Sequence, residues 1–106
     1  MMPKLQKLLT NIPCGKITTY KIIANKLGTS PRAIGRMLSK NQYPDKYPCY
    51  KVVMSNCKLG GYSGGIRKKI ALLEKDGIFV KRGKIMCFKE ILYIYGGKQN
   101  ISRMFC

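Results

Sequence analysis

Two short helical patterns joined by a glycine turn constrain the fold of this chain more than any other feature. Segment 20–27 repeats apolar residues at helical spacing, and Gly28 follows it as a helix terminator. A second helix starts only about three residues later, because Ser30 is a capping residue and Pro31 suits a first helical turn. Helices joined by so tight a turn predict a helix-turn-helix motif.

The second of these helices has a basic face. Its apolar residues, which we expect to face the core, are Ile34, Met37 and Leu38. Arg32, Arg36 and Lys40 recur on another face, which is the arrangement that a DNA-recognition helix needs. Gly35 lies among them and weakens the helix by up to about 1 kcal/mol relative to alanine. A nucleic-acid strand that approaches the backbone closely would explain a glycine there.

The remaining patterns predict a small, mainly helical domain. The expected elements are an amphipathic helix over 3–11, a strand over 51–54, a helix over 66–77 and a hairpin over 78–88. The helix over 66–77 is expected to face the core through Ile66, Ile70 and Leu73. Beyond residue 88 we find no clear pattern. The prediction is a single domain that is mainly α with a small β component, a winged helix-turn-helix-like fold.

The charge of the chain indicates its partner. A hydrophobic content of 45% excludes an intrinsically disordered chain, yet 21 Lys and Arg against 4 Asp and Glu leave a formal net charge of +17. A solvated basic face explains a single lysine, but so large an excess indicates a polyanion, nucleic acid rather than anionic lipid. No apolar run of about 18 residues and no signal-peptide pattern is present. We therefore expect a monomer inside the cell, in the cytoplasm or nucleoid, with no membrane contact.

The cysteines form no metal-binding pattern. There are five of them without a Cys-x-x-Cys pair, and histidine is absent, so a zinc site would need four scattered cysteines. We expect neither a metal nor a cofactor. The cysteines expected to be small, reduced core residues are Cys14, Cys57, Cys87 and Cys106.

Cys49 is the exception. It lies in the stretch "YPDKYPCYKVV", directly after a proline, and Lys46 and Lys51 flank it. A cysteine beside proline is by itself more often structural than catalytic. However, the thiolate is the nucleophilic form, an unperturbed thiol has a pKa of about 8.5, and nearby cations lower that pKa. The neighbourhood therefore makes Cys49 a candidate nucleophile.

Four blocks of sequence resemble one known family. "IPCGKITTYKIIANKLG", "SPRAIGRML", "N…PCYKVV" and "GGYSGG…K…LLEKDG" are similar, in order and spacing, to the alkylguanine-DNA alkyltransferases, the methylated-DNA-protein-cysteine methyltransferase family. The similarity runs from about Ile12 to Gly77. We accordingly expect residues 1–80 to form the DNA-binding and reactive-cysteine domain, and residues 81–106 a hairpin strand and a tail.

The resemblance implies that Cys49 accepts an alkyl group from the oxygen-6 position of guanine in double-stranded DNA, in one irreversible event. It also implies that the target nucleotide is flipped out of the duplex, which costs a few kcal/mol. Arg32 would fill the space that the nucleotide leaves, and Tyr20 would press on the adjoining phosphate. The other DNA-contacting positions would be Gly35, Arg36, Ser39, Lys40 and Lys51.

The resemblance further implies a pocket for the extruded base. Asn41 would brace the turn between the recognition helix and the reactive loop. Main-chain carbonyls of Cys49 and Val52 would read the exocyclic amine of guanine. The residues around the base would be Tyr62, Ser63, Gly64 and Lys69.

The chain departs from the family at the proton relay. The family has a histidine after the nucleophile and a glutamate beyond it, whereas this chain has Tyr50 and Asp76, and Lys51 replaces an arginine. A phenol with a pKa of about 10 is a poor base near neutrality, so Tyr50 is expected to orient a water or the thiolate. We expect slower alkyl transfer. A lesion-binding protein without transfer, which signals to other repair factors, and a helix-turn-helix protein without lesion selectivity remain alternatives.

Overall fold

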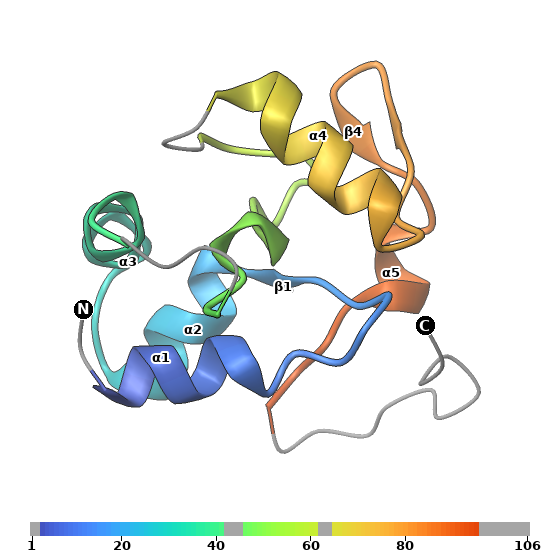
Figure 1. Ribbon diagram of the computed structural model, residues 1–106. Helices are drawn as coiled ribbons and strands as arrows, with labels where there is room; N and C mark the ends of the chain where they lie inside the picture. Colours follow the sequence, from blue (N-terminus) through green and yellow to red (C-terminus); the bar gives the residue numbers. More distant parts are fainter. Residues whose placement is uncertain (1–2, 42–45, 62–64, 96–106) are drawn as a thin grey trace.

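The computed structural model describes residues 3–41, 46–61 and 65–95 (Figure 1). Its elements are α1 (Pro3–Thr10), β1 (Thr18–Thr19), α2 (Tyr20–Leu27), α3 (Pro31–Ser39), the 3₁₀ turn η1 (Cys49–Lys51), β2 (Val52–Val53), α4 (Ile66–Lys75), β3 (Val80–Lys81), β4 (Lys84–Ile85) and α5 (Phe88–Ile91). Helices α1, α2 and α3 lie on one side of the short sheet, and α4 with the hairpin lies on the other (Figure 1). The expected fold, mainly α with a small β component, is confirmed.

The helix-turn-helix forms at the predicted residues. Thr19 caps α2, its side chain accepting a hydrogen bond from the Ile22 N–H at 3.0 Å. Gly28 ends α2 in the left-handed conformation with φ 71°. Ser30 then caps α3 by accepting from the Ala33 N–H at 3.2 Å, and Pro31 occupies the first turn. The local capping chemistry therefore sets the tight turn between the two helices.

Two hydrophobic clusters fill the domain, one on each side of the sheet. The helical cluster contains Leu5, Leu8, Leu9, Ile12, Ile23, Ala24, Ile34, Leu38, Cys49 and Val52. The wing cluster contains Ile17, Val53, Leu59, Leu73, Ile78 and Ile85. Adjacent residues of β2 belong to different clusters because successive side chains of a strand point to opposite faces. Strand β2 thus joins the helix-turn-helix to the wing, which consists of α4 and the β3–β4 hairpin.

Strand β1 was not predicted, since the segment before α2 reads as a turn. It pairs with β2 in parallel, Thr18 opposite Val52 and Thr19 opposite Val53. Because Tyr20 follows β1 directly and Met54 follows β2 directly, this register places these two residues at the same end of the sheet. The sheet is small, but it positions the candidate site.

The inward face of α4 differs from the prediction. Ile66 is exposed, whereas Lys69 and Leu73 are buried and Ile70 is half-buried. A buried lysine is tolerated here because its ammonium group donates to three main-chain carbonyls. Apolar periodicity alone therefore assigned Ile66 to the wrong environment.

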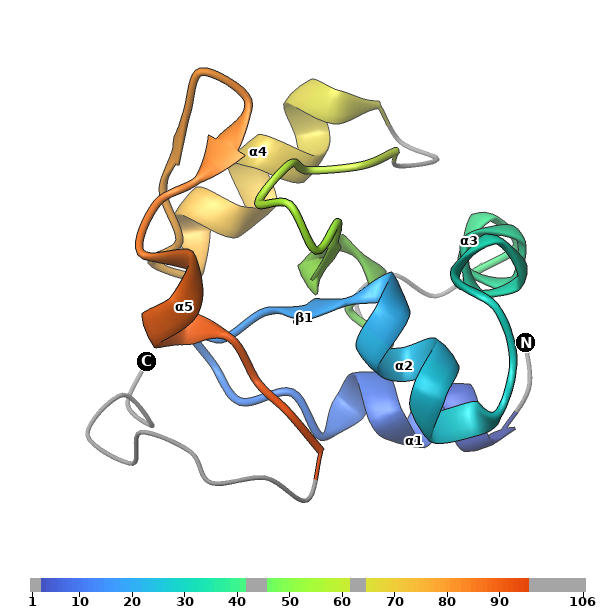
Figure 2. The same ribbon diagram turned by 180° about the vertical axis from the view of Figure 1, so that it is seen from behind.

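The hairpin forms as predicted, with Arg82 and Gly83 both at positive φ in a two-residue turn. Helix α5 and the segment after it were not predicted. This segment returns to the N-terminal half (Figure 2). There the Tyr93 N–H donates to the Ile17 carbonyl at 2.6 Å. The Thr18 hydroxyl donates to the Tyr93 carbonyl at 3.1 Å. The predicted division into 1–80 and 81–106 falls within β3 and stays a prediction.

Within the ranges described above, no helix is long and apolar enough to cross a membrane.

Candidate nucleic-acid interface and reactive cysteine

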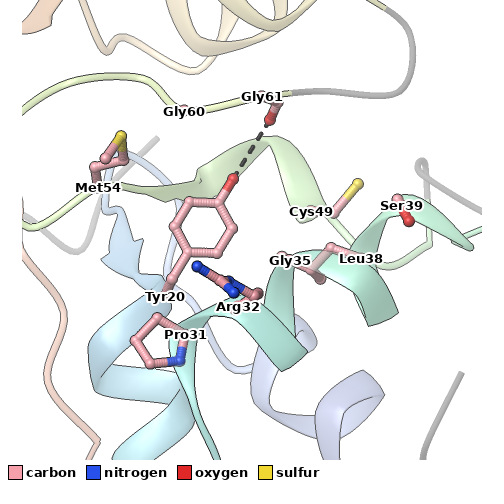
Figure 3. A pocket seen from close by; sticks show the side chains of 10 residues that line it. All are labelled: Tyr20, Pro31, Arg32, Gly35, Leu38, Ser39, Cys49, Met54, Gly60 and Gly61. Atoms are coloured by element: carbon pink, nitrogen blue, oxygen red, sulfur yellow. Dashed lines mark hydrogen bonds between the residues drawn. The ribbon is translucent and has the colours of Figure 1, made fainter.

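A cavity of about 640 Å³ opens between α3 and the loop that follows β2 (Figure 3). The residues that line it are Tyr20, Pro31, Arg32, Gly35, Leu38, Ser39, Cys49, Met54, Gly60 and Gly61. The Cys49 sulfur faces the space between α3 and the glycines of the loop (Figure 3). The fold therefore places the candidate nucleophile beside the recognition helix.

A tight turn presents Cys49 to the cavity. The Cys49 N–H donates to the Tyr47 carbonyl at 2.7 Å, across Pro48 with φ −75° and ψ 74°. These angles define an inverse γ-turn, to which the proline ring contributes its fixed φ. The Asn41 side-chain amide donates to the same Tyr47 carbonyl at 2.8 Å. Asn41 thus links the end of α3 to the turn that carries the thiol.

Tyr20 and Gly60 shape the opposite wall. The Tyr20 hydroxyl lies 3.4 Å from the Gly61 carbonyl and donates a hydrogen bond to it. Burial, and then the negative charge of Cys49, raise the pKa of Tyr20, so the phenol keeps its proton. A Cβ at Gly60 would lie 3.0 Å from both the ring and the hydroxyl of Tyr20, and φ there is +74°. Only glycine fits this close approach without strain.

Lys69 supports the loop that forms one wall of the cavity. Its Nζ donates to the carbonyls of Val52, Leu59 and Gly61 at 2.8, 2.6 and 3.2 Å. It also lies 5.9 Å from the centre of the Tyr20 ring. Burial lowers the pKa of Lys69 from 10.5 to about 8, and the negative charge of Cys49 acts in the opposite direction. Lys69 therefore holds the loop in place and supplies positive charge near the thiol.

The carbonyls expected to read the base are already engaged. The Val52 carbonyl accepts from Lys69, and the Cys49 carbonyl accepts from the Val52 N–H. A carbonyl oxygen has two lone pairs, so each can still accept a second hydrogen bond.

Lys51 is not available as a DNA contact, which corrects the expectation from the resemblance. It is 5% exposed, its Nζ lies 2.9 Å from Asp76 Oδ2, and it donates to the Pro13 carbonyl at 3.1 Å. The carboxylate of Asp76 also accepts from the Gly15 N–H at 3.0 Å, and the Cys14 sulfur lies 3.0 Å from Oδ1. Asp76 thus ties the end of α4 to the turn before β1.

The phenol of Tyr50, expected beside the thiol, packs against the wing cluster and is not among the residues that line the cavity. Arg32, Gly35 and Ser39 do line it, together with Tyr20 and Cys49. Arg36 and Lys40 are exposed and lie outside the lining. Predicted pocket residues outside the described ranges are Tyr62, Ser63 and Gly64.

Several lining residues were missed by the sequence reasoning: Pro31, Leu38, Met54, Gly60 and Gly61. The paired glycines carried a usable signal, since a glycine-rich loop after a strand often marks a close backbone approach. Met54 carried none, because a methionine after a strand is an ordinary packing residue.

The other cysteines differ in how deeply they are buried. Cys57 is half-buried and Cys87 is exposed, so the expectation of core cysteines is wrong for Cys87. Cys14 is half-buried and disulfide-bonded, so the expectation that it is reduced is wrong. Cys106 lies outside the described ranges. In the described part of the chain, no group of three or more His, Cys, Asp or Glu side chains could hold a metal ion.

Comparisons with known proteins agree with this geometry. Residues 2–78 match the family model described as 6-O-methylguanine DNA methyltransferase, DNA binding domain. The methylated-DNA–protein-cysteine methyltransferase of Saccharolobus islandicus is 51% identical over 72 residues, which cover 68% of this chain and 47% of that protein. The O6-methylguanine-DNA methyltransferase structure from Pyrococcus kodakaraensis has a TM-score of 0.67 and 41% identity, covering 73% of this chain and 47% of that one.

A second solved structure resembles the chain in fold alone. S. pombe Atl1, in complex with damaged DNA containing O6-carboxymethylguanine, has a TM-score of 0.71 at 21% identity and covers 85% of this chain and 91% of that one. The chain spans about half the length of the methyltransferases it matches, at 47% of each. The match over residues 2–78 shows that the chain belongs to the 6-O-methylguanine DNA methyltransferase family, through its DNA-binding domain.

Proposed function

We propose that this chain repairs DNA by moving an alkyl group from the oxygen-6 position of guanine to Cys49. The observation that carries the proposal is the free, buried Cys49 thiol on the wall of a cavity of about 640 Å³ beside the recognition helix. The Cys49 sulfur attacks the alkyl carbon, the carbon–oxygen bond breaks and a carbon–sulfur bond forms. The thiol proton ends on the restored guanine, so each protein molecule reacts once.

The cavity suits a flipped purine. Its volume lies within the usual range of about 300–1,000 Å³ for small-molecule sites. A base inside a duplex is out of reach of a thiol, so the target nucleotide must leave the stack. Arg32 lies at the cavity and on α3, where it can occupy the vacated space in the duplex. Tyr20 lies on the opposite wall, where its ring can meet the neighbouring phosphate.

The described charge beside the thiol is positive. Lys69 supplies positive charge next to the lining residues Tyr20 and Gly61, and no acidic residue is among the described residues that line the cavity. Tyr50 packs away from this lining, and Asp76 is paired with Lys51. Neither relay position therefore lies at the described cavity lining, and we expect transfer to be slow.

The first prediction concerns the mass of the protein. Incubation with a duplex that contains O6-methylguanine should add one methyl group to the peptide that carries Cys49, as measured by intact-protein and peptide mass spectrometry. Cys49→Ser should abolish the addition while duplex affinity is retained. Cys57→Ser is the matched control, because Cys57 is also free but lies outside the cavity lining, and it should react normally.

One observation favours a second function, a lesion-recognition protein that does not transfer the group. The chain shares its fold with S. pombe Atl1 over 91% of that protein's length. In this case lesion-containing DNA would bind selectively, yet the mass of the protein would never change.

The second prediction tests nucleotide flipping with two arginines on the same helix. Both are exposed residues of α3, but Arg32 lines the cavity and Arg36 does not. Arg32→Ala should weaken binding to a lesion-containing duplex more than binding to a single strand, because only the duplex has a gap to fill. Arg36→Ala should weaken both by similar factors. Fluorescence anisotropy measures the four affinities, and equal losses for Arg32→Ala on the two substrates would contradict its role.

A further inference from the structure

A second cavity, of about 420 Å³, lies at the other end of α2. The residues that line it are Lys4, Lys7, Leu8, Asn11, Lys26, Leu27, Tyr93 and Tyr95, none of which lines the Cys49 cavity. Tyr20 begins α2 and Leu27 ends it, so the two cavities are separated by about 10 Å along the helix. Figure 2 shows the segment after α5 returning toward α1. Tyr93 and Tyr95 of this segment line the second cavity.

The aromatic wall of the cavity is held in place by specific contacts. The Tyr93 backbone N–H donates to Ile17, and its carbonyl accepts from the Thr18 hydroxyl. The Tyr95 hydroxyl donates to the Leu8 carbonyl at 2.6 Å, which satisfies one of the carbonyls left over at the end of α1. The Tyr93 and Tyr95 rings meet edge to face, with centroids 4.9 Å apart. Both tyrosines lie beyond residues 2–78, the part that matches the family model.

The chemistry of the lining is that of a site for an aromatic anion. Leu8 and Leu27 supply apolar surface beside the tyrosine rings, and three lysines lie around it. No acidic side chain is among the described lining residues, and burial, followed by the neighbouring Tyr93, raises the pKa of Tyr95, so the phenol stays neutral. A nucleobase stacks on an aromatic ring through its π-face, and its phosphates pair with lysines. The Asn11 amide offers both a donor and an acceptor to a base edge.

We propose that this cavity of Tyr93, Tyr95 and Lys26 seats one unpaired nucleotide of a single DNA strand. The proposal goes beyond alkyl transfer, because it assigns a second nucleic-acid site to a part of the chain outside the family match. The cavity volume of about 420 Å³ fits one nucleotide better than a longer segment of DNA.

A photochemical cross-link tests where the strand lies. A short oligothymidylate with one 5-iodouracil is irradiated with the full-length Cys49→Ser protein, which cannot transfer alkyl groups, and the cross-linked peptide is mapped by mass spectrometry. The proposal expects a cross-link at Tyr93 or Tyr95. Cross-links confined to the α3 surface would overturn it and would leave the alkyl-transfer proposal untouched.

Two matched variants test affinity. Lys26 lies in the last turn of α2 and Lys75 in the last turn of α4, so Lys26→Glu and Lys75→Glu change the same charge at equivalent helix positions. Lys26→Glu should weaken binding of the oligothymidylate by at least about fivefold relative to Lys75→Glu, measured by fluorescence anisotropy at fixed salt. Melting curves of both variants verify folding. Equal affinities would overturn the proposal.

Competition experiments against the bound oligothymidylate identify which chemical class of ligand the second cavity prefers. Thymidine monophosphate should displace the oligothymidylate only weakly, because it lacks the flanking phosphates that the lysines bind. An abasic oligonucleotide of the same length should compete less well than the oligothymidylate, because it lacks the bases that stack on the tyrosines. An acidic peptide that competes better than the oligothymidylate would overturn the assignment to nucleic acid.

Discussion

Buried lysines are the unusual residues of this protein. Lys16, Lys51 and Lys69 are each at most 5% exposed, although the residue type is mostly found at surfaces. Each ammonium group has a defined partner: Lys16 donates to the Glu90 carbonyl, Lys51 pairs with Asp76, and Lys69 donates to three carbonyls. These three lysines therefore support the fold and are not part of the DNA-facing charge.

A prediction at the residue scale concerns Lys69. Its pKa is about 8 in the folded protein against 10.5 as the ordinary value, so between these pH values the unfolded chain binds more protons than the folded one. Stability contributed by Lys69 must therefore rise with pH across that window, by up to about 3 kcal/mol. The free energy of unfolding of the wild type, minus that of Lys69→Met, should increase accordingly in urea titrations from pH 8 to 10.5.

The control for this measurement is Lys68→Met. Lys68 is the exposed neighbour of Lys69 on α4. Its difference from the wild type should stay nearly flat over the same pH range. A flat difference for Lys69→Met as well would show that the buried ammonium group is not destabilised by its surroundings.

Gly35 and Gly60 both line the cavity of Cys49, but the absence of a side chain has a different consequence at each. Gly60 has φ +74° and the Tyr20 ring 3.0 Å from where its Cβ would lie, so the loop itself requires glycine. Gly35 has a helical conformation, and a Cβ there would meet nothing within 4 Å. The space next to Gly35 is therefore free for a bound molecule.

At the scale of the element we predict opposite effects on stability from alanine at these two positions. Gly35→Ala should stabilise the protein by up to about 1 kcal/mol, because alanine favours the helix, while weakening DNA binding by narrowing the cavity mouth. Gly60→Ala should destabilise it, because of both the positive φ and the contact with Tyr20. Thermal unfolding and anisotropy together measure the two effects. If Gly35→Ala bound DNA as well as the wild type, no strand would approach that part of α3.

At the scale of the whole molecule, charge and chain topology act together. Of the 21 Lys and Arg residues, only the three lysines discussed above are buried among the described ones. The return of residues 92–95 to β1 and α1 closes the domain and builds the second cavity from both ends of the described chain. The other described basic residues are exposed and give the molecule a surface suited to a polyanion.

The matching prediction is a strong dependence of duplex binding on salt. Lysines and arginines release counterions from the phosphates, and a handful of contacts gives a log–log slope of roughly −3 to −6. Anisotropy titrations of a plain duplex across a range of salt concentrations measure this slope. A slope near zero would remove the nucleic-acid interface from the proposed function.

The amino-acid sequence by itself determined the features that depend on neighbouring residues. The caps Thr19 and Ser30, the terminator Gly28 and the hairpin turn at Arg82–Gly83 act within a few positions of the chain, so their patterns predicted the helix-turn-helix and the wing. The stretch around Cys49 likewise marked the candidate nucleophile, which the fold places in a cavity with Tyr20, Arg32, Gly35 and Ser39.

Only the tertiary structure decided which charges are buried and where the late segment packs. Asp76 contacts residues 61 and 62 positions away in the chain, and Tyr95 contacts one 87 positions away. No local pattern reports such partners, and for this reason Lys51 was expected on the DNA surface, Ile66 in the core, and the packing after residue 88 was not predicted. A lysine reads as exposed from its type alone, and it is the carbonyls and carboxylates gathered by folding that make its burial possible.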